Sequence, residues 1–257
     1  MWTGSGVMDM QLGNSVQNFI NSYGVKPFIW HNWPVNDYSR DHLFMGKTDG
    51  LDSKLCEKIC GFTANPMEFP EASKVTVYSV ADYLWNMSAY DADRSWQQAW
   101  QYLYPANGKN FGLFCQNSVN PGSNRINRPG ESDYFNAELK KGTAAGKLFA
   151  DIYEAANALL ADNSDPAVAE EMQPWLRAMQ ITGHRGMLLD SLQQALTAAQ
   201  PSDFVTYYQK MKELAKEASA LESHTWYGGS GRICPTYGTL VLAPHIQRQM
   251  LAQAQAF

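Results

Sequence analysis

The sequence predicts an α/β part followed by an all-α part, with the change near residue 128. Residues 1–128 are rich in Gly, Pro, Asn and aromatic residues and contain short apolar segments. Residues 129–257 are rich in Ala, Leu, Gln, Glu and Lys, and their apolar positions have helical spacing. Each part is long enough to bury a core. We therefore expect two domains, residues 1–128 and residues 129–257.

The α/β part is predicted from a helix–strand–loop unit that occurs twice. Residues 14–23 have an apolar helical face, and residues 27–30 form a short apolar run that is typical of a buried strand. Residues 54–58 are a second candidate helix, and residues 59–63 are a second candidate strand. Polar residues follow each strand at once. This order predicts βα repeat units.

Two more helices are expected before residue 128. Residues 71–85 have apolar positions spaced by three and four, which fits a helix, although their β-branched content leaves a strand possible. Residues 95–103 carry Trp96 and Trp100 on one helical face, with Ser95 as a suitable N-cap.

The second part predicts a bundle of long helices. Candidate helices cover residues 134–160, 166–199 and 203–221. The middle one is expected to break near Gly183 or Gly186, because glycine weakens a helix interior.

Composition excludes several classes of protein. The formal net charge is -5 with an isoelectric point near 5.5, which argues against a nucleic-acid partner. No apolar run is long enough to predict a membrane span. The first residues lack the features of a signal peptide and resemble the interior of a domain.

Cysteine and histidine patterns predict no metal and no cofactor. The four cysteines are too few for a disulfide scaffold, and the Cys56–Cys60 spacing lacks the second pair that a zinc site needs. The five histidines also lack zinc spacing, so each is expected to be packed or on the surface. No Gly-x-Ser-x-Gly elbow is present, and no lysine follows the Gly228–Gly231 loop.

The segment Trp30-His31-Asn32-Trp33-Pro34-Val35-Asn36-Asp37-Tyr38 is the candidate site. It places amides, a carboxylate and aromatic rings directly after a predicted buried strand. Such groups bind sugar hydroxyls and stack on sugar faces. On the residues alone, a loop capped by its own Asn and Asp side chains remains open, and the aromatic enrichment equally suits a hydrophobic core.

Several blocks of the first part together resemble glycoside hydrolase family 84. They are the segment above, then Leu-Phe-Met-Gly-Lys-Thr-Asp-Gly at 43–50, Gly-Phe-Thr-Ala-Asn-Pro-Met-Glu at 61–68, and residues 71–86. Trp2-Thr3-Gly4 with Val7 is similar to a preceding strand end. The resemblance covers residues 1–105 closely and the helical remainder loosely. It implies the last three strands of a (β/α)8 barrel, with residues 71–85 as the final barrel helix, followed by a helical bundle.

The resemblance also implies a substrate and its binding residues. The family removes terminal β-linked N-acetylglucosamine from proteins or glycans. Asp37 would accept hydrogen bonds from the outer sugar hydroxyls, and Asn65 would hold a neighbouring hydroxyl. Asn32 would support the pocket, and Trp30 would form a wall for the acetamido group. Two further residues would line its mouth: Thr3 and Val7.

One departure from the family is decisive for activity. Family members use substrate assistance, in which one Asp orients the acetamido group and an adjacent Asp is the general acid and base. This sequence contains no Asp-Asp pair. Asp91 and Asp93 precede a helix in an unrelated block and are interpreted as loop and N-cap. The family's tyrosine from the next strand is also missing. We therefore expect no catalytic residue here and no glycosidase activity from this chain alone.

Two hypotheses remain from the sequence. The chain is part of a retaining β-N-acetylglucosaminidase whose partner is an N-acetylglucosamine-bearing glycan or glycoprotein. Alternatively, it is a non-enzymatic carbohydrate-binding or helical interaction protein derived from that family. The sequence leaves localisation open, and a secreted or periplasmic location is compatible with a full-length parent.

Overall fold

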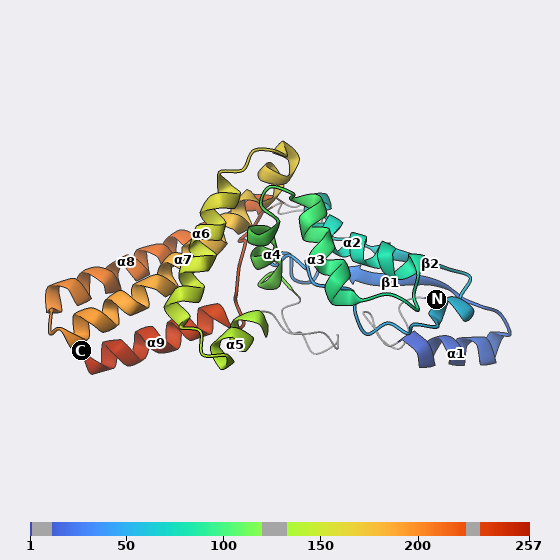
Figure 1. Ribbon diagram of the computed structural model, residues 1–257, viewed down its shortest axis with the longest axis horizontal. Helices are drawn as coiled ribbons and strands as arrows, with labels where there is room; N and C mark the ends of the chain where they lie inside the picture. The colour runs from blue at the N-terminus through green and yellow to red at the C-terminus, as the bar shows by residue number, and fades with distance from the viewer. Residues whose placement is uncertain (2–11, 120–132, 225–231) are drawn as a thin grey trace. The chain divides into compact units, whose positions relative to one another are not determined.

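The computed structural model describes residues 1, 12–119, 133–224 and 232–257. The described residues are mostly helical, with a two-stranded parallel sheet and a short antiparallel pair (Figure 1). The chain divides into two compact units. One comprises Met1–Gly112 and Val119–Gly130, and the other comprises Leu113–Ser118 and Glu131–Phe257. Among the described residues, no helix is both long and apolar enough to cross a membrane.

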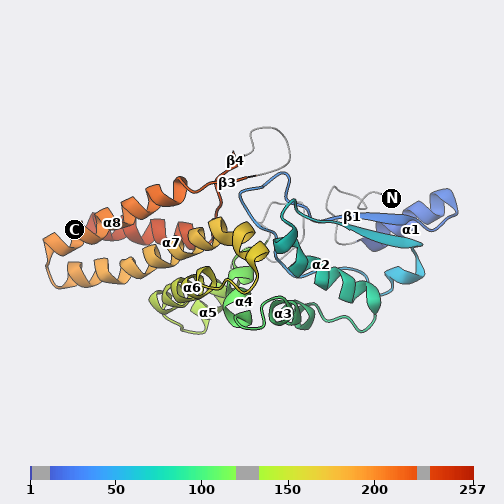
Figure 2. The same cartoon turned by 90° about the horizontal axis from the view of Figure 1, so that it is seen from above.

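The first unit is built around two neighbouring parallel strands. Its elements are α1 (Leu12–Tyr23), β1 (Phe28–Pro34), the 3-10 helix η1 (Leu55–Glu57), β2 (Gly61–Asn65), α2 (Pro70–Trp85) and α3 (Ala92–Leu103). Helix α4 (Gly108–Gln116) follows and contributes residues to both units. Figures 1 and 2 both show α2 running beside the two strands. The predicted order of helix, strand, helix, strand and helix is confirmed.

The two faces of β1 have different surroundings. Ile29 is fully buried in a core cluster with Leu12, Val16, Leu55, Tyr83 and Met87, which come from α1, η1, α2 and the turn after α2. On the opposite face, Phe28 is 53% exposed and Trp30 is 43% exposed. A Cβ on Gly61 of β2 would lie 2.5 Å from the Phe28 ring, so glycine is what lets this ring lie across the neighbouring strand. Helices therefore cover one face of the sheet, and the other face retains exposed aromatic surface.

Two details of the first unit differ from prediction or go beyond it. Ser95 is not an N-cap: it lies buried inside α3, and the cap is Asp91, whose Oδ1 accepts a 2.9 Å hydrogen bond from the Arg94 amide. The interpretation of Asp91 as an N-cap is thus confirmed. Two strands are too few to show a closed barrel, so the predicted (β/α)8 origin stays a prediction.

The second unit is helical. Its elements are α5 (Asp133–Lys140), α6 (Ala145–Leu160), α7 (Pro166–Thr197), α8 (Pro201–Ser219), β3 (Ser223–His224), β4 (Arg232–Ile233) and α9 (Leu242–Ala256). Helix α7 contacts α6, α8 and α9, and Figure 2 shows α8 and α9 running along it. The predicted helical character of this part is confirmed. The boundary at residue 128 stays a prediction.

Helix boundaries in this unit correct two predictions. The single helix expected at 134–160 is two helices, because Gly142 adopts a φ of 92° after α5 and its amide bonds back to Leu139 O at 3.0 Å. The break expected at Gly183 or Gly186 is absent, and α7 is continuous. A Cβ on Gly183 would lie 2.7 Å from the Tyr153 backbone nitrogen. These glycines therefore allow α6 to pack closely on α7.

We expect Gly186→Ala to destabilise the helical unit. In a helix interior this substitution normally stabilises by about 1 kcal/mol, because alanine has the higher helix propensity. Here the added Cβ would lie 2.0 Å from Cγ of Phe149, so overpacking should cost about 1–3 kcal/mol. Urea unfolding followed by circular dichroism measures the change. Glu170→Ala, at an exposed position of the same helix, is the control, and stabilisation by Gly186→Ala would contradict the packing.

Candidate functional site

The candidate site lies where β1 and β2 end. The strands pair in parallel from Phe28 with Gly61 to His31 with Ala64, and the register then jumps so that Pro34 pairs with Asn65. The Trp33–Pro34 peptide bond is cis. At the register jump, β1 has two extra residues relative to β2, Asn32 and Trp33. Such an irregularity at a strand end redirects side chains. It brings Asn32 of β1 beside Asn65 of β2.

Three of the predicted sugar-binding residues are joined by hydrogen bonds. The Trp30 indole Nε1 donates to Asn32 Oδ1 at 2.7 Å, and Asn65 Nδ2 donates to the same oxygen at 3.0 Å. Asn32 is 3% exposed, whereas Trp30 and Asn65 keep part of their surface open. Asn32 therefore acts as a buried acceptor that orients the indole ring and the Asn65 amide. The arrangement offers an apolar ring beside amide groups, which suits a sugar with an acetamido substituent.

Asp37, the fourth predicted residue, lies in the loop directly after β1. Its side chain is exposed, and the loop begins with a 2.9 Å hydrogen bond from the Val35 amide to Asn65 O at the end of β2. The structure thus places Asp37 beyond the same strand end, outside the Trp30–Asn32–Asn65 cluster. The predicted mouth residues, Thr3 and Val7, lie outside the described residues.

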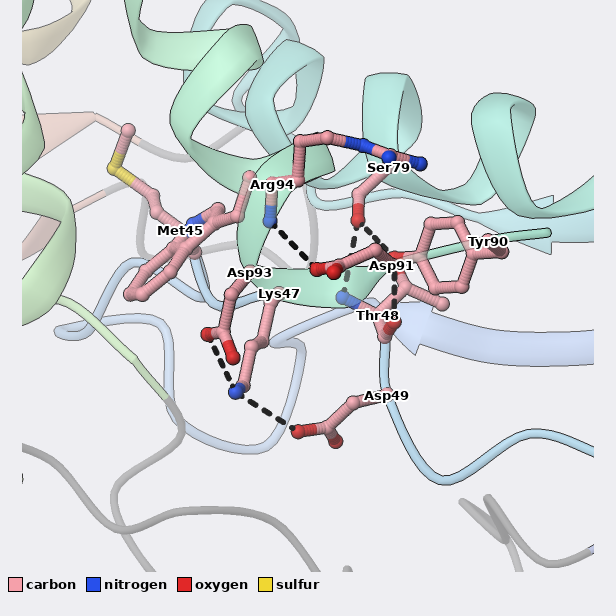
Figure 3. A network of polar contacts seen from close by, with 10 residues as sticks. Met45, Lys47, Thr48, Asp49, Ser79, Tyr90, Asp91, Asp93 and Arg94 are labelled. Atoms are coloured by element: carbon pink, nitrogen blue, oxygen red, sulfur yellow. Dashed lines mark hydrogen bonds and ion pairs between the residues drawn. The ribbon is translucent and has the colours of Figure 1, made fainter.

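A polar network holds the chain between β1 and β2 (Figure 3). The Thr48 amide donates to Ser79 Oγ at 3.2 Å, Ser79 Oγ lies 2.6 Å from the Tyr90 hydroxyl, and that hydroxyl donates to Thr48 O at 2.5 Å. The three residues form a closed ring of hydrogen bonds. Two further bonds, from Thr76 Oγ1 to Phe44 O and from Trp96 Nε1 to Met45 O, fasten the same segment to α2 and α3.

The charged and titratable groups of this network are largely structural. Burial raises the pKa of Tyr90 to about 12, although the hydrogen bond with Ser79 opposes the change. Burial lowers the pKa of Lys47, but the hydrogen bond and charge of Asp93, together with Asp49, outweigh it and raise the pKa overall. The Lys47–Asp93 pair is 2.8 Å long, and Asp93 is well exposed, so it contributes little to stability. Because both pKa values are raised, Tyr90 and Lys47 keep their neutral-pH protonation state over a wide range.

Sequence reasoning did not identify the network residues. Thr48, Ser79 and Tyr90 are separated by up to 42 residues, and no local pattern links hydroxyls that distant. No group of three or more His, Cys, Asp or Glu residues that could hold a metal occurs in the portion of the chain that the structure describes.

Comparison with known proteins relates the first part of the chain to one family. Residues 1–116 match the family model for beta-N-acetylglucosaminidase. The protein O-GlcNAcases of Rattus norvegicus and Mus musculus are each 30% identical to this chain over 95 residues, covering 36% of this chain and 10% of the relative. The predicted relationship to glycoside hydrolase family 84 is therefore confirmed, and residues 1–116 carry its sequence pattern.

Solved structures extend the likeness to the whole chain at the level of fold. The structure of CpGH84D has a TM-score of 0.86 at 22% identity and covers 99% of this chain. That of CpGH84B has a TM-score of 0.77 at 24% identity and covers 97%. A mutant of the Thermobaculum terrenum O-GlcNAc hydrolase has a TM-score of 0.80 at 21% identity and covers 99%. The chain spans 44–55% of the length of these structures.

We expect Tyr90→Phe to lower the free energy of unfolding by about 1–3 kcal/mol at neutral pH, because it removes the hydroxyl that closes the ring and leaves Thr48 O without that donor. The pKa of Tyr90 is raised to about 12 in the folded chain, against about 10 in an unfolded one. The native state therefore holds this proton more tightly. The protonated Tyr90 hydroxyl therefore makes its full contribution to stability below about pH 10, and this contribution is lost as the pH rises towards 12.

Urea unfolding of wild type and Tyr90→Phe at pH 7 and between pH 10 and 12 measures both effects. The variant should lose less stability than wild type over the alkaline range. Tyr102→Phe, at a 74% exposed tyrosine on α3, is the control and should leave the unfolding free energy at pH 7 unchanged. Equal stability of wild type and Tyr90→Phe at pH 7 would contradict the proposed role of the ring.

Proposed function

We propose that this chain supplies part of the sugar pocket of a family 84 β-N-acetylglucosaminidase. The observation that carries the proposal is the hydrogen-bonded cluster of Trp30, Asn32 and Asn65 at the ends of two adjacent parallel strands. The family match over residues 1–116 supports the choice of N-acetylglucosamine as ligand. In this proposal Trp30 contacts the acetamido group, Asn65 and Asp37 bind hydroxyls, and Thr3 and Val7 line the mouth.

We further propose that the first unit is the C-terminal portion of a (β/α)8 barrel. Two adjacent parallel strands, with η1 in their connection and helices on one face, support this because that fold repeats parallel strands and helices. The edge of β1 opposite β2 bonds Met1 in the alternating pattern of a parallel neighbour: the Met1 amino group donates to Phe28 O at 2.5 Å, and the Trp30 amide donates to Met1 O at 2.9 Å. Residues 1–128 are then barrel, and residues 129–257 are the helical domain after it.

In this proposal the chain binds a sugar but does not cleave it. Substrate-assisted hydrolysis needs one carboxylate to orient the acetamido group and a second to transfer protons. The turn after β1 carries Asp37 and Asp41, which are four positions apart, and the sequence holds no Asp-Asp pair. In a complete enzyme the pair would come from an earlier barrel strand. A non-enzymatic sugar-binding protein is the second candidate, and the same missing pair favours it.

We expect the purified chain to show no enzyme-like hydrolysis of an aryl N-acetylglucosaminide. Without a positioned acid and base, about 10²–10⁴-fold of rate enhancement is lost for each proton-transfer role. Release of the aryl alcohol, followed by absorbance against a buffer blank, is the measurement. Saturable turnover that survives purification would show that the chain has a catalytic group outside the proposed scheme.

Binding of N-acetylglucosamine to the purified chain tests the pocket itself. Saturation-transfer NMR with titration should show binding of N-acetylglucosamine and weaker binding of glucose, which lacks the acetamido group. Asp37→Ala should weaken binding about tenfold or more, because each hydrogen bond to a carboxylate contributes about 1.5–3 kcal/mol. Glu57→Ala removes the same charge at an exposed position of η1 and is the matched control. No preference between the two sugars, or equal effects of the two variants, would overturn the proposal.

A further inference from the structure

The loop that carries Asp37 is closed by the buried side chain of its neighbour. Asn36 is 1% exposed, and its Nδ2 donates a 2.7 Å hydrogen bond to the backbone oxygen of His42. The backbone repeats the closure, since the Ser39 amide donates to Asn36 O at 2.8 Å and the His42 amide donates to Ser39 O at 3.1 Å. The side chain of Asn36 thus spans the whole turn from which Asp37 projects.

Both ends of this turn are attached to rigid parts of the first unit. Before it, the Val35 amide bonds Asn65 O at the end of β2. After it, Leu43, Phe44 and Met45 are buried, and the Thr76 hydroxyl of α2 donates to Phe44 O at 3.1 Å. Only the few residues between these attachments can therefore move, and the Asn36–His42 hydrogen bond joins the two ends of that stretch.

We propose that Asn36 is a positioning residue that holds Asp37 in the orientation needed to bind sugar hydroxyls. This inference rests on the proposed function for its ligand. A carboxylate on a mobile turn binds more weakly, because the turn loses conformational entropy when the ligand orders it. A turn that is already closed by a buried hydrogen bond avoids that cost. The Asn36 amide acts through Asp37 and does not contact the sugar.

The substitution Asn36→Ala tests the proposal, and the chain offers a matched control. Asn117 is also fully buried, and its Nδ2 donates to a backbone oxygen, that of Leu113, at 3.1 Å, but it belongs to the second unit. Both variants lose a hydrogen bond from a buried side-chain amide to a backbone oxygen. We expect Asn36→Ala to weaken binding of N-acetylglucosamine about tenfold and Asn117→Ala to leave it unchanged. Equal affinity of the two variants would overturn the proposal.

A second comparison separates positioning from general damage. If Asn36 acts through Asp37, Asn36→Ala should weaken binding no further when Asp37 is already alanine. An equal loss in both backgrounds would show that Asn36 acts elsewhere. If Asn36→Ala does not fold, Asn36→Gln takes its place, because it keeps the amide but displaces it by one methylene.

Amide hydrogen exchange gives a readout that needs no sugar. Asn36→Ala should speed exchange of the Ser39 and His42 amides while leaving the Thr48 amide, which bonds Ser79, unchanged. Failure of the wild-type chain to bind N-acetylglucosamine would overturn the proposed function alone. The exchange rates would then decide whether Asn36 holds the turn that carries Asp37: faster exchange confined to the turn supports this role, and unchanged rates overturn it.

Discussion

The parallel pairing of β1 with β2 is the constraint on which the site depends. Parallel strands bring their carboxyl ends to one edge, so polar residues 33 positions apart in sequence meet there. The insertion of two residues in β1 just before that edge lets Asn32 lie beside Asn65. Because Asn32 Oδ1 accepts from both Trp30 and Asn65, one buried oxygen sets the orientation of two groups on the site surface. A slip of the register by one residue would move these side chains to opposite faces.

The division of β1 into a buried face and an exposed face explains the chemistry of the two sides. Ile29 lies in the apolar cluster formed with α1, η1 and α2, and this burial fixes the strand. Phe28 and Trp30 project from the opposite face and stay partly exposed. The indole is held by a hydrogen bond at Nε1 and stays partly exposed, so its polar atom is satisfied while part of its ring surface faces outward. One set of β1 side chains thus packs in the core, and the other set lies on the side of the candidate site.

The helices and strands of the first unit could be predicted because they follow local rules. Apolar spacing predicted α2, and resemblance to family 84 decided between helix and strand there. The predicted break in α7 was wrong because it was drawn from local propensity alone. Gly183 and Gly186 looked like a helix break because local propensity disfavours glycine, but their role is to admit Tyr153 and Phe149 of α6 against an unbroken helix. Tertiary packing outweighs a propensity cost of about 1 kcal/mol per glycine.

The candidate site shows the same division between local and distant information. The polar segment after β1 is visible in the sequence, and so are Asn32, Asp37 and Asn65. The ring of Thr48, Ser79 and Tyr90 is not visible, because each hydroxyl is unremarkable within its own helix or loop. Its bonds are between neutral groups or to backbone oxygens, whereas the ion pair beside it, Lys47 with Asp93, is exposed and weak. Neutral hydrogen bonds that hold this loop are insensitive to salt and to pH changes near neutrality, which suits the proposed recognition of an uncharged sugar.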